Sequence, residues 1–146
     1  PFGAAIFDRK NGDLVSVGVN QVEKINCSLV HAEMLAIALA QKAIGNYDLG
    51  YNANISYELV TSTEPCAMCL GAICWSGVKQ VVCGARDEDA RAIGFDEGPK
   101  PENWIRSLKE RGISVIKDVQ REQAKAVLSD YRKTGGLIYN SREEQS

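Results

Sequence analysis

Residues 57–85, YELVTSTEPCAMCLGAICWSGVKQVVCGA, decide the fold that this sequence predicts. Tyr57–Ser62 and Lys79–Ala85 are runs of β-type residues, and the segment Cys66–Ser76 between them is a predicted helix. Pro65 stands at the start of that helix, where proline is favoured because the first backbone nitrogens have no partner within the helix. Alternation of strand, helix and strand is typical of a layered α/β domain.

The segments before this unit continue the alternation. Gly3–Asp8 and Leu14–Asn20 are apolar β-type runs on either side of an Asn-Gly turn, which predicts an antiparallel hairpin. Along Leu29–Ala43 the apolar residues recur at helical spacing, with Ser28 as the expected N-cap and Gly45 as the stop. This helix is apolar almost all round, so we expect it to be buried.

The segments after the unit add a loop, two helices and a strand. Residues 93–101 hold two glycines and two prolines and predict a long loop, a feature that is often functional in a small domain. We expect a helix at Glu102–Arg111, a strand at Ile113–Lys117 and a last helix at Gln120–Arg132. There is no repeat or linker, so residues 1–146 form one predicted domain, with 142–146 expected to be a disordered charged tail.

Composition supports one globular domain and excludes several classes of protein. The chain has 146 residues, 45% hydrophobic and 25% charged. It holds no run of about 18 apolar residues, so no membrane span is expected. No basic leader with an apolar segment is present, and the cysteine count of five is odd, so we expect reduced thiols and a cytoplasmic location. The formal net charge of -2 disfavours nucleic acid as a partner, because proteins that hold a phosphate backbone usually carry a basic excess.

Three residues have the chemistry of a metal site. His31 is the only histidine of the chain and falls in the first turn of its predicted helix. Cys66 and Cys69 lie three residues apart at the start of the next helix, so both sulfurs project from one face, and a helix N-terminus favours the thiolate form. One nitrogen and two sulfurs suit Zn²⁺ with a fourth position open, as in catalytic sites. A fourth ligand from Cys27 or Cys74 would instead make the site structural.

Glu33 follows the predicted metal ligand His31 by two residues. An open zinc site activates water as a nucleophile, and a carboxylate beside that water can carry its proton to a substrate. A first-turn glutamate can also simply stabilise the helix dipole. Next to a metal-binding histidine, the sequence favours the proton carrier.

The blocks His31-Ala32-Glu33 and Pro65-Cys66-Ala67-Met68-Cys69 resemble the H-x-E and P-C-x-x-C motifs of the zinc-dependent cytidine deaminase superfamily. Within that superfamily the sequence resembles the bacterial guanine deaminase branch, guanine/ammeline type. The residues that carry this finer resemblance are 1–4, Asn20, 61–64, 71–75, the loop 93–97 and its continuation 98–104. The resemblance therefore covers residues 1–104.

The resemblance implies an α/β fold, a three-layer α/β/α sandwich with a central five-stranded mixed sheet and zinc between two helix N-termini. Family members carry a helix before the strand that begins Pro-Phe-Gly. The sequence starts at Pro1, so we expect it to be a fragment that lacks this helix. The resemblance also implies a homodimer, and it leaves open whether residues 136–140 dock on their own subunit or on the partner.

The resemblance assigns roles residue by residue: catalysis to Glu33 and Glu97, metal binding to His31, Cys66 and Cys69, and substrate binding to Asn20, Phe2, Ala32, Trp75 and Asp96. Glu97 would hold the ring N–H edge of a purine and assist proton transfer, and Asn20 would hydrogen-bond the base. Phe2 and Trp75 would line the base pocket. The structural alternatives are a solvated loop charge for Glu97, a turn residue for Asn20 and core aromatic residues for the other two.

The activity that the resemblance implies is hydrolysis of guanine to xanthine and ammonia. Activated water would attack C2 of guanine, Glu33 would protonate the adjacent ring nitrogen, and ammonia would leave. Ammeline, guanosine and cytosine remain alternative small substrates. A tRNA adenosine deaminase shares the zinc blocks, but the acidic composition and the Asp96-Glu97 pair disfavour it. A non-catalytic zinc module that serves assembly is the remaining alternative.

Overall fold

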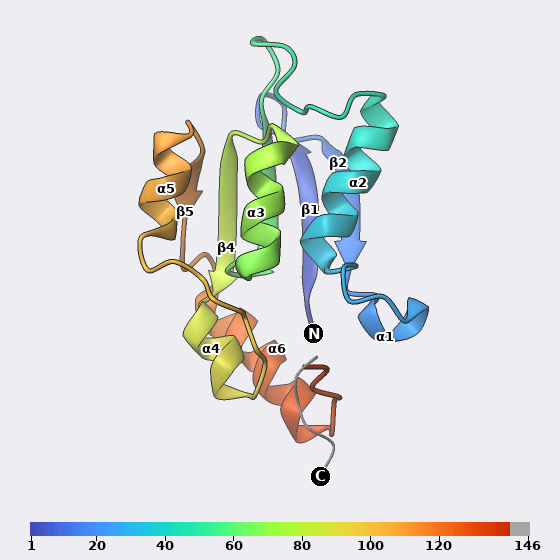
Figure 1. Ribbon diagram of the computed structural model, residues 1–146, viewed down its shortest axis with the longest axis vertical. Helices are drawn as coiled ribbons and strands as arrows, with labels where there is room; N and C mark the ends of the chain where they lie inside the picture. Colours follow the sequence, from blue (N-terminus) through green and yellow to red (C-terminus); the bar gives the residue numbers. More distant parts are fainter. Residues whose placement is uncertain (141–146) are drawn as a thin grey trace.

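The computed structural model describes residues 1–140, and the expected tail at 142–146 lies outside the described residues. Five strands form one sheet in the order β2-β1-β3-β4-β5 (Figure 1). The strands are β1 (Gly3–Asp8), β2 (Leu14–Val19), β3 (Tyr57–Thr63), β4 (Gln80–Ala85) and β5 (Ser114–Ile116). The helices are α1 (Val22–Ile25), α2 (Ala32–Ile44), α3 (Ala67–Ser76), α4 (Asp87–Ala92), α5 (Trp104–Glu110) and α6 (Arg121–Lys133).

The sheet is mixed, as the family resemblance implies. The Asn-Gly turn joins β1 and β2 as an antiparallel hairpin, and β1 pairs antiparallel with β3 on its other side. β3 and β4 run parallel, with α3 as the connection between them, and β4 and β5 are parallel as well. A parallel pair needs such a crossover, because the chain must return to the first end of the sheet before the second strand can start.

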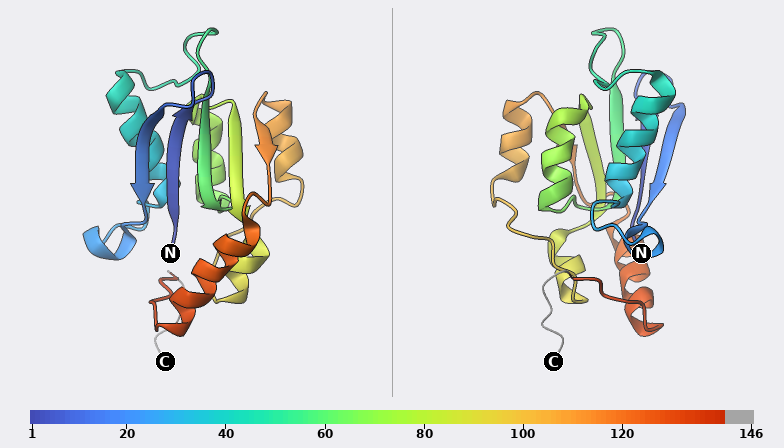
Figure 2. Two further views of the ribbon diagram at one scale, coloured as in Figure 1. Left: turned by 180° about the vertical axis from the view of Figure 1, so that it is seen from behind. Right: turned by 45° about the vertical axis from the view of Figure 1, so that its right-hand side comes forward.

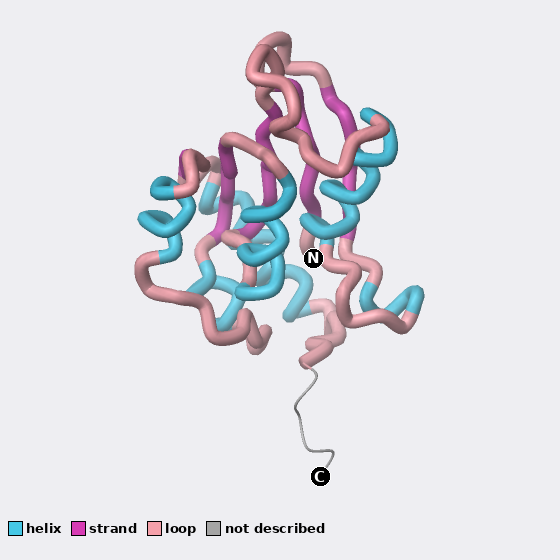
Figure 3. Tube along the Cα trace, turned by 45° about the horizontal axis from the view of Figure 1, so that its top comes forward, coloured by secondary structure: helices cyan, strands magenta, loops and turns pink. Residues whose placement is uncertain are grey.

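Helices lie on both faces of the sheet. α2, α3 and α5 form one layer, whereas α6 lies on the opposite face across β4 (Figures 1 and 2). Figure 3 shows α2 and α3 side by side in front of the strands, with loops gathered at both ends of the sheet. Beside α6, the sheet face forms an apolar hollow of about 560 Å³ lined by β1, β3, β4 and α6. The α/β/α arrangement is confirmed, with α6 alone covering the second face within residues 1–140.

The core lies between the sheet and the α2 and α3 layer. Every second residue of β3 is buried, which is the alternation expected of a strand with one face against helices. Ile6, Leu59 and Val81 of the sheet are fully buried, as is Ile73 of α3. Tight packing against α2 depends on small residues, since a Cβ atom at Gly18 in β2 would overlap the carbonyl oxygen of Ala32. This contact fixes the first turn of α2 on the sheet.

Two predictions about α2 are corrected. The helix begins at Ala32 with His31 as the N-cap residue, not at Leu29 with Ser28 as the cap. The carbonyl of Val30 accepts a hydrogen bond from the N–H of Gln21, so the preceding residues form a separate turn. The helix is not buried all round, because its outer face, with Leu39 41% exposed, carries no covering element among residues 1–140.

Two short helices were not predicted, and both are too short to show a periodic pattern. α1 is one turn between β2 and α2, and α4 follows β4 directly. Each of the other helices and strands lies where the sequence places it, with its ends at most three residues from the predicted ones.

Gly18→Ala should destabilise the fold, because the added methyl group forces β2 away from the start of α2. We expect a loss of about 1–3 kcal/mol in the free energy of unfolding, measured by urea denaturation. Gly71→Ala is the matched control, since Gly71 lies in α3 with open space around it and alanine favours a helix. Equal effects of the two substitutions would contradict the packing role of Gly18.

Candidate metal centre and pocket

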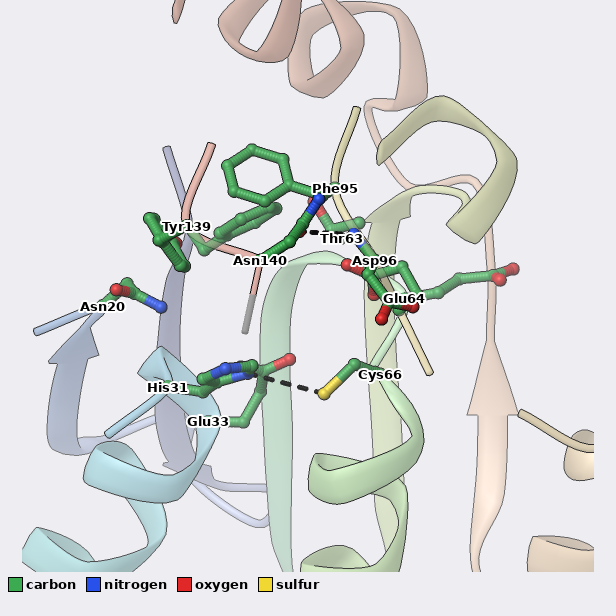
Figure 4. Close-up of a pocket in the computed structure, with 12 residues that line it drawn as sticks. Asn20, His31, Glu33, Thr63, Glu64, Cys66, Phe95, Asp96, Tyr139 and Asn140 are labelled. Atoms are coloured by element: carbon green, nitrogen blue, oxygen red, sulfur yellow. Dashed lines mark hydrogen bonds between the residues drawn. The ribbon is translucent and has the colours of Figure 1, made fainter. Parts of the chain in front are cut away.

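His31, Cys66 and Cys69 form a compact set of metal-binding atoms. The Nδ1 atom of His31 lies 3.4 Å from Sγ of Cys66 and 3.6 Å from Sγ of Cys69. All three donor atoms lie within 4.8 Å of one another. Figure 4 shows His31 and Cys66 facing each other from the starts of two helices.

The position of these residues follows from the sheet. Because β3 and β4 are parallel, α3 begins at the carboxyl end of β3, with Cys66 as its N-cap residue and Cys69 in the first turn. α2 begins at the same end of the sheet with His31 as its N-cap residue. Ligands at the carboxyl ends of parallel strands are a general property of open α/β sheets. Two helix N-termini therefore meet at the candidate metal centre.

The three residues fit Zn²⁺. Tetrahedral zinc with its usual bond lengths separates a nitrogen ligand and a sulfur ligand by about 3.6 Å, close to the observed separations. Hydrogen bonds from the Cys69 thiol and from His31 lower the pKa of Cys66 to about 4, so this sulfur is a thiolate, the form that binds a metal. Within residues 1–140, neither Cys27 nor Cys74 joins the group. These three ligands leave a coordination position open.

Glu33 lies against this metal centre. Its side chain lines the same pocket as His31 and Cys66 (Figure 4), and the residue is only 7% exposed. Burial is the main cause that raises the pKa of the carboxyl, and the negative charge of Cys66 adds to it. A buried carboxyl beside a metal centre can both take and give a proton.

A pocket opens above the metal centre. Its inner part has a volume of about 60 Å³, and it continues into an outer part of about 380 Å³ that shares His31, Cys66 and Glu97 in its wall. The inner part is lined by Phe2, Asn20, His31, Glu33, Thr63, Glu64, Cys66, Phe95, Asp96, Glu97, Tyr139 and Asn140. The structure thus brings together seven residues that the sequence singles out: Phe2, Asn20, His31, Glu33, Cys66, Asp96 and Glu97.

Glu97 is the second buried carboxyl of the pocket. It is 7% exposed, and its backbone carbonyl accepts a hydrogen bond of 2.9 Å from the N–H of Ala67 at the start of α3. Burial raises the pKa of Glu97 to about 8, with further increases from the charges of Cys66, Asp87 and Glu33. A carboxyl with this pKa exchanges its proton near neutral pH, which a solvated loop charge would not do.

Asn20 faces the pocket and is also a turn residue, the two roles considered for it. It lines the pocket (Figure 4), and its Oδ1 atom accepts a hydrogen bond of 3.1 Å from the N–H of Val22, as in a turn. This hydrogen bond fixes the orientation of the amide. The NH₂ group is left to donate to another acceptor in the pocket.

The C-terminal residues close the pocket in cis. The Tyr139 ring packs at 5.1 Å from the ring of Phe95, and Phe95 packs at 4.8 Å from Phe2. Asn140 accepts a hydrogen bond of 2.9 Å from the N–H of Asp96 and donates one of 2.8 Å to the carbonyl of Gly94. The Tyr139 hydroxyl is buried without a hydrogen-bond partner among the described residues, and burial raises its pKa.

Trp75 and Ala32 are not among the residues that line the pocket, which corrects the expectation for both. Trp75 lies near the C-terminal end of α3 and is 84% exposed. Trp75 follows Cys66, the N-cap residue, by nine positions, which is a distance of about 13 Å along the helix axis. Ala32 is fully buried in the first turn of α2, and its carbonyl oxygen lies against Gly18 of β2.

Sequence reasoning missed Thr63, Glu64, Phe95, Tyr139 and Asn140 as residues of the pocket. Thr63 and Glu64 directly precede the Pro65-Cys66 motif, so their position next to a predicted metal ligand was an available signal. Phe95 stands in the loop that the sequence marks as functional. Tyr139 and Asn140 belong to the segment 136–140, for which the resemblance left open docking on its own subunit or on the partner.

Comparison with known proteins gives a match to one protein-family model. The model of the cytidine and deoxycytidylate deaminase zinc-binding region matches residues 1–85. This range contains His31, Glu33, Cys66 and Cys69.

Individual relatives include deaminases of two kinds. The guanine deaminase of Bacillus subtilis is 43% identical over 97 residues, which are 66% of this chain and 58% of that protein. The tRNA-specific adenosine deaminase of Rickettsia bellii is 38% identical over 93 residues, 64% of this chain and 61% of that protein. The chain therefore spans about three fifths of the length of these curated relatives. The solved structure of a guanine deaminase from Nitrosomonas europaea has a TM-score of 0.89 and 49% identity, covering 91% of this chain and 73% of that chain.

Replacing Cys66 or Cys69 by serine should abolish tight zinc binding, because a hydroxyl group at neutral pH is a poor substitute for a thiolate. We expect about one zinc per chain in the unaltered protein and a loss of affinity of at least ~100-fold in either variant. Elemental analysis and competition with a chelator measure both quantities. Cys27→Ser and Cys74→Ser are the controls and should retain zinc; loss of zinc in either would show that the site has a fourth protein ligand.

Proposed function

Because this chain belongs to the cytidine and deoxycytidylate deaminase family, we propose that it catalyses the hydrolytic deamination of guanine to xanthine and ammonia. One observation carries the proposal: the candidate metal centre, through His31 and Cys66, and two buried carboxyl groups, Glu33 and Glu97, line a single pocket. The likeness to guanine deaminases of two bacteria favours guanine among aminated heterocycles. The reaction would serve purine breakdown.

Proton transfer is the role of Glu33. Zn²⁺ held by His31, Cys66 and Cys69 would supply the Lewis acid that activates water near neutral pH. The Glu33 carboxylate takes one proton as the water oxygen bonds to C2 of guanine, and it delivers this proton to the adjacent ring nitrogen. It then moves the second proton of the water to the amino group, so that the C2–N bond breaks, ammonia leaves and a carbonyl remains. The raised pKa of Glu33 suits a group that takes and gives protons in turn.

Recognition of the base is the role of Asn20 and Glu97. The Asn20 NH₂ group can donate to an acceptor of the purine, since its Oδ1 atom is already used by Val22. The Glu97 carboxyl can accept from the ring N–H edge and assist proton transfer, because its pKa of about 8 lies near neutral pH. Phe2 adds an aromatic wall, and Asp96 lies at the rim, 47% exposed at its side chain. The packed rings of Phe2, Phe95 and Tyr139 line the pocket, and the low polarity of this wall strengthens the polar interactions beside it.

Glu33→Gln should abolish ammonia release from guanine while the protein retains its zinc. We expect a fall of about 10²–10⁴-fold in kcat, because glutamine cannot carry a proton. Glu97→Gln should reduce kcat/KM, mainly through KM. Glu102→Gln is the control, since Glu102 is an exposed glutamate of the same loop. Full turnover by a zinc-loaded Glu33→Gln variant would contradict the mechanism.

The same assay decides the substrate. Guanine, ammeline, guanosine, cytosine, adenine and a tRNA anticodon stem-loop would be compared with the zinc-loaded protein. The tRNA-specific adenosine deaminases among the relatives make RNA the second candidate, although the net charge of -2 and the acidic pocket rim disfavour a phosphate backbone. Release of ammonia from the RNA alone would identify adenosine in RNA, and not guanine, as the substrate. Turnover of no substrate would favour a non-catalytic zinc module.

A cytoplasmic location is part of the proposal. All five cysteines, including the two metal ligands, are free thiols, which suits a reducing compartment. Among residues 1–140, no helix has the length and apolar character that crossing a bilayer requires.

We propose further that the chain forms a homodimer through the outer face of α2 and α3. This face carries Leu39, 41% exposed, and Trp75, 84% exposed, with Tyr47, 87% exposed, beside them. A shallow hollow of about 360 Å³ lies between Met34 and Trp75. Exposed apolar side chains gathered around one hollow mark an interaction surface. A second copy offers a complementary surface, because a two-fold interface uses the same patch of both chains.

Trp75→Glu should convert the dimer into a monomer, because the substitution places a charge at the centre of the apolar face. Sedimentation equilibrium measures the mass. Leu14→Glu is the matched control, since Leu14 is a 55% exposed leucine on the edge strand β2. A dimer that persists in Trp75→Glu, or dissociates equally in Leu14→Glu, would contradict the proposed interface.

A further inference from the structure

We infer that Lys100 is a positioning residue, which anchors the loop that carries Glu97 to the start of α3 through a buried ion pair with Glu64. The inference rests on the proposed function for its effect on turnover, but the anchoring itself is a property of this chain alone. Glu64 directly follows β3, and only Pro65 separates it from Cys66. Lys100 follows Glu97 by three residues.

The ion pair is buried on both sides. The Nζ atom of Lys100 lies 3.2 Å from Oε2 of Glu64, and each side chain is only 6% exposed. Lysine and glutamate are almost never buried to this extent unless they are paired. Removing two charges from water costs several kcal/mol, so two apolar side chains in place of Lys100 and Glu64 would stabilise the fold at least equally. A role beyond stability explains why charges stand here.

Further contacts direct Lys100 and Glu64 to this arrangement. The Lys100 ammonium lies over the Trp104 ring at 4.3 Å from its centre, which holds the side chain in place. The Oε2 atom of Glu64 also accepts a hydrogen bond of 3.1 Å from the N–H of Asp87 at the start of α4. The pair therefore joins the end of β3, the start of α4 and the Glu97 loop at one point.

Before Glu97 the loop is held by Asn140 and by the packing of Phe95, and two further contacts hold it at Glu97 and Gly98. The N–H of Ala67 donates to the Glu97 carbonyl at 2.9 Å, which links the loop to the first turn of α3. Arg91 donates to the Gly98 carbonyl at 2.8 Å from an exposed side chain. Lys100 is the buried charged attachment on the C-terminal side of Glu97, and without it only the Ala67 hydrogen bond and an exposed arginine hold residues 97–100.

Lys117 provides a comparison for Lys100, because it contacts the same carboxylate. Lys117, after β5, lies 3.3 Å from the other oxygen of the same carboxylate, Oε1 of Glu64. Its side chain is 34% exposed, and Oε1 has no hydrogen bond of good geometry among the described residues. If Glu64 needed only a neutralising charge, the two lysines would be equivalent. Only Lys100 is on the segment that carries Glu97.

The test compares Lys100→Met with Lys117→Met in the zinc-loaded protein. Hydrogen–deuterium exchange of peptides covering residues 94–100 and the Ala67 amide reports the anchoring without any substrate. We expect faster exchange in Lys100→Met and unchanged exchange in Lys117→Met, with zinc retained by both. The kcat/KM for guanine should fall about 10²-fold in Lys100→Met only, the size of effect that a displacement of about 1 Å in a binding group can cause.

A double variant separates positioning from stability. Glu64→Gln with Lys100→Met removes both members of the buried pair. Lys117, which also loses Glu64, is 34% exposed, and Asp87 retains its ion pair with Arg91. The double variant should therefore recover the urea midpoint that Lys100→Met loses, while loop exchange stays fast and kcat/KM stays low. Lys100→Arg should restore part of the protection, because arginine can also pair with Glu64. Should Lys100→Met fail to fold, the double variant and Lys100→Arg provide the same comparison.

Three results would overturn the inference: equal behaviour of Lys100→Met and Lys117→Met, unchanged exchange of residues 94–100 in the double variant, or full recovery of kcat/KM together with stability. Absence of guanine turnover in the unaltered protein would overturn the proposed function instead. The exchange comparison would still decide whether Lys100 anchors the loop.

Discussion

The parallel pairing of β3 with β4 is the constraint on which the rest of this structure depends. Because Leu59 pairs with Val81 and Thr63 with Ala85 in the same direction, the chain between the strands must travel back along the sheet, and α3 is that path. Its first turn therefore lies at the carboxyl end of β3, where α2 also begins. The metal ligands, the pocket and the attachment of the Glu97 loop all follow from this meeting of two helix starts.

Three buried carboxyl groups share a small volume at these helix starts. Glu33, Glu64 and Glu97 are each at most 7% exposed, and mutual repulsion would keep such groups neutral unless positive charge compensates. Their partners differ. Glu64 has the ammonium of Lys100, whereas the raised pKa values of Glu33 and Glu97 show that burial dominates there. A bound metal ion would balance the charge of Glu33. The ion pair of Glu64 with Lys100 therefore differs in kind from Glu33 and Glu97, the two acids with raised pKa values.

Local patterns in the sequence predicted most of the fold and the metal ligands. The strand, helix and strand of residues 57–85, the Asn-Gly hairpin and the pairing of His31 with Cys66 depend on residues that are close in sequence or constrained by element order. Trp75 shows where resemblance misleads, since its distance along α3 from Cys66 already excluded it from the pocket. For Tyr139 and Asn140 the resemblance predicted docking of their segment but not its partners, because only the path of the chain after α6 brings them to Phe95 and Gly94. The Glu64 and Lys100 pair was hidden for the same reason: 36 residues separate its members.

The span between the metal ligands has a thermodynamic meaning. His31 and Cys66 are 35 residues apart, and between them lie α2 and β3. A bound metal ion would close this stretch of chain into a ring, as a disulfide does, and would restrict the unfolded ensemble by an entropy that grows with the logarithm of ring size. The ion that would prepare the reaction would thus also be a cross-link, and one that does not need the oxidising environment in which disulfides persist.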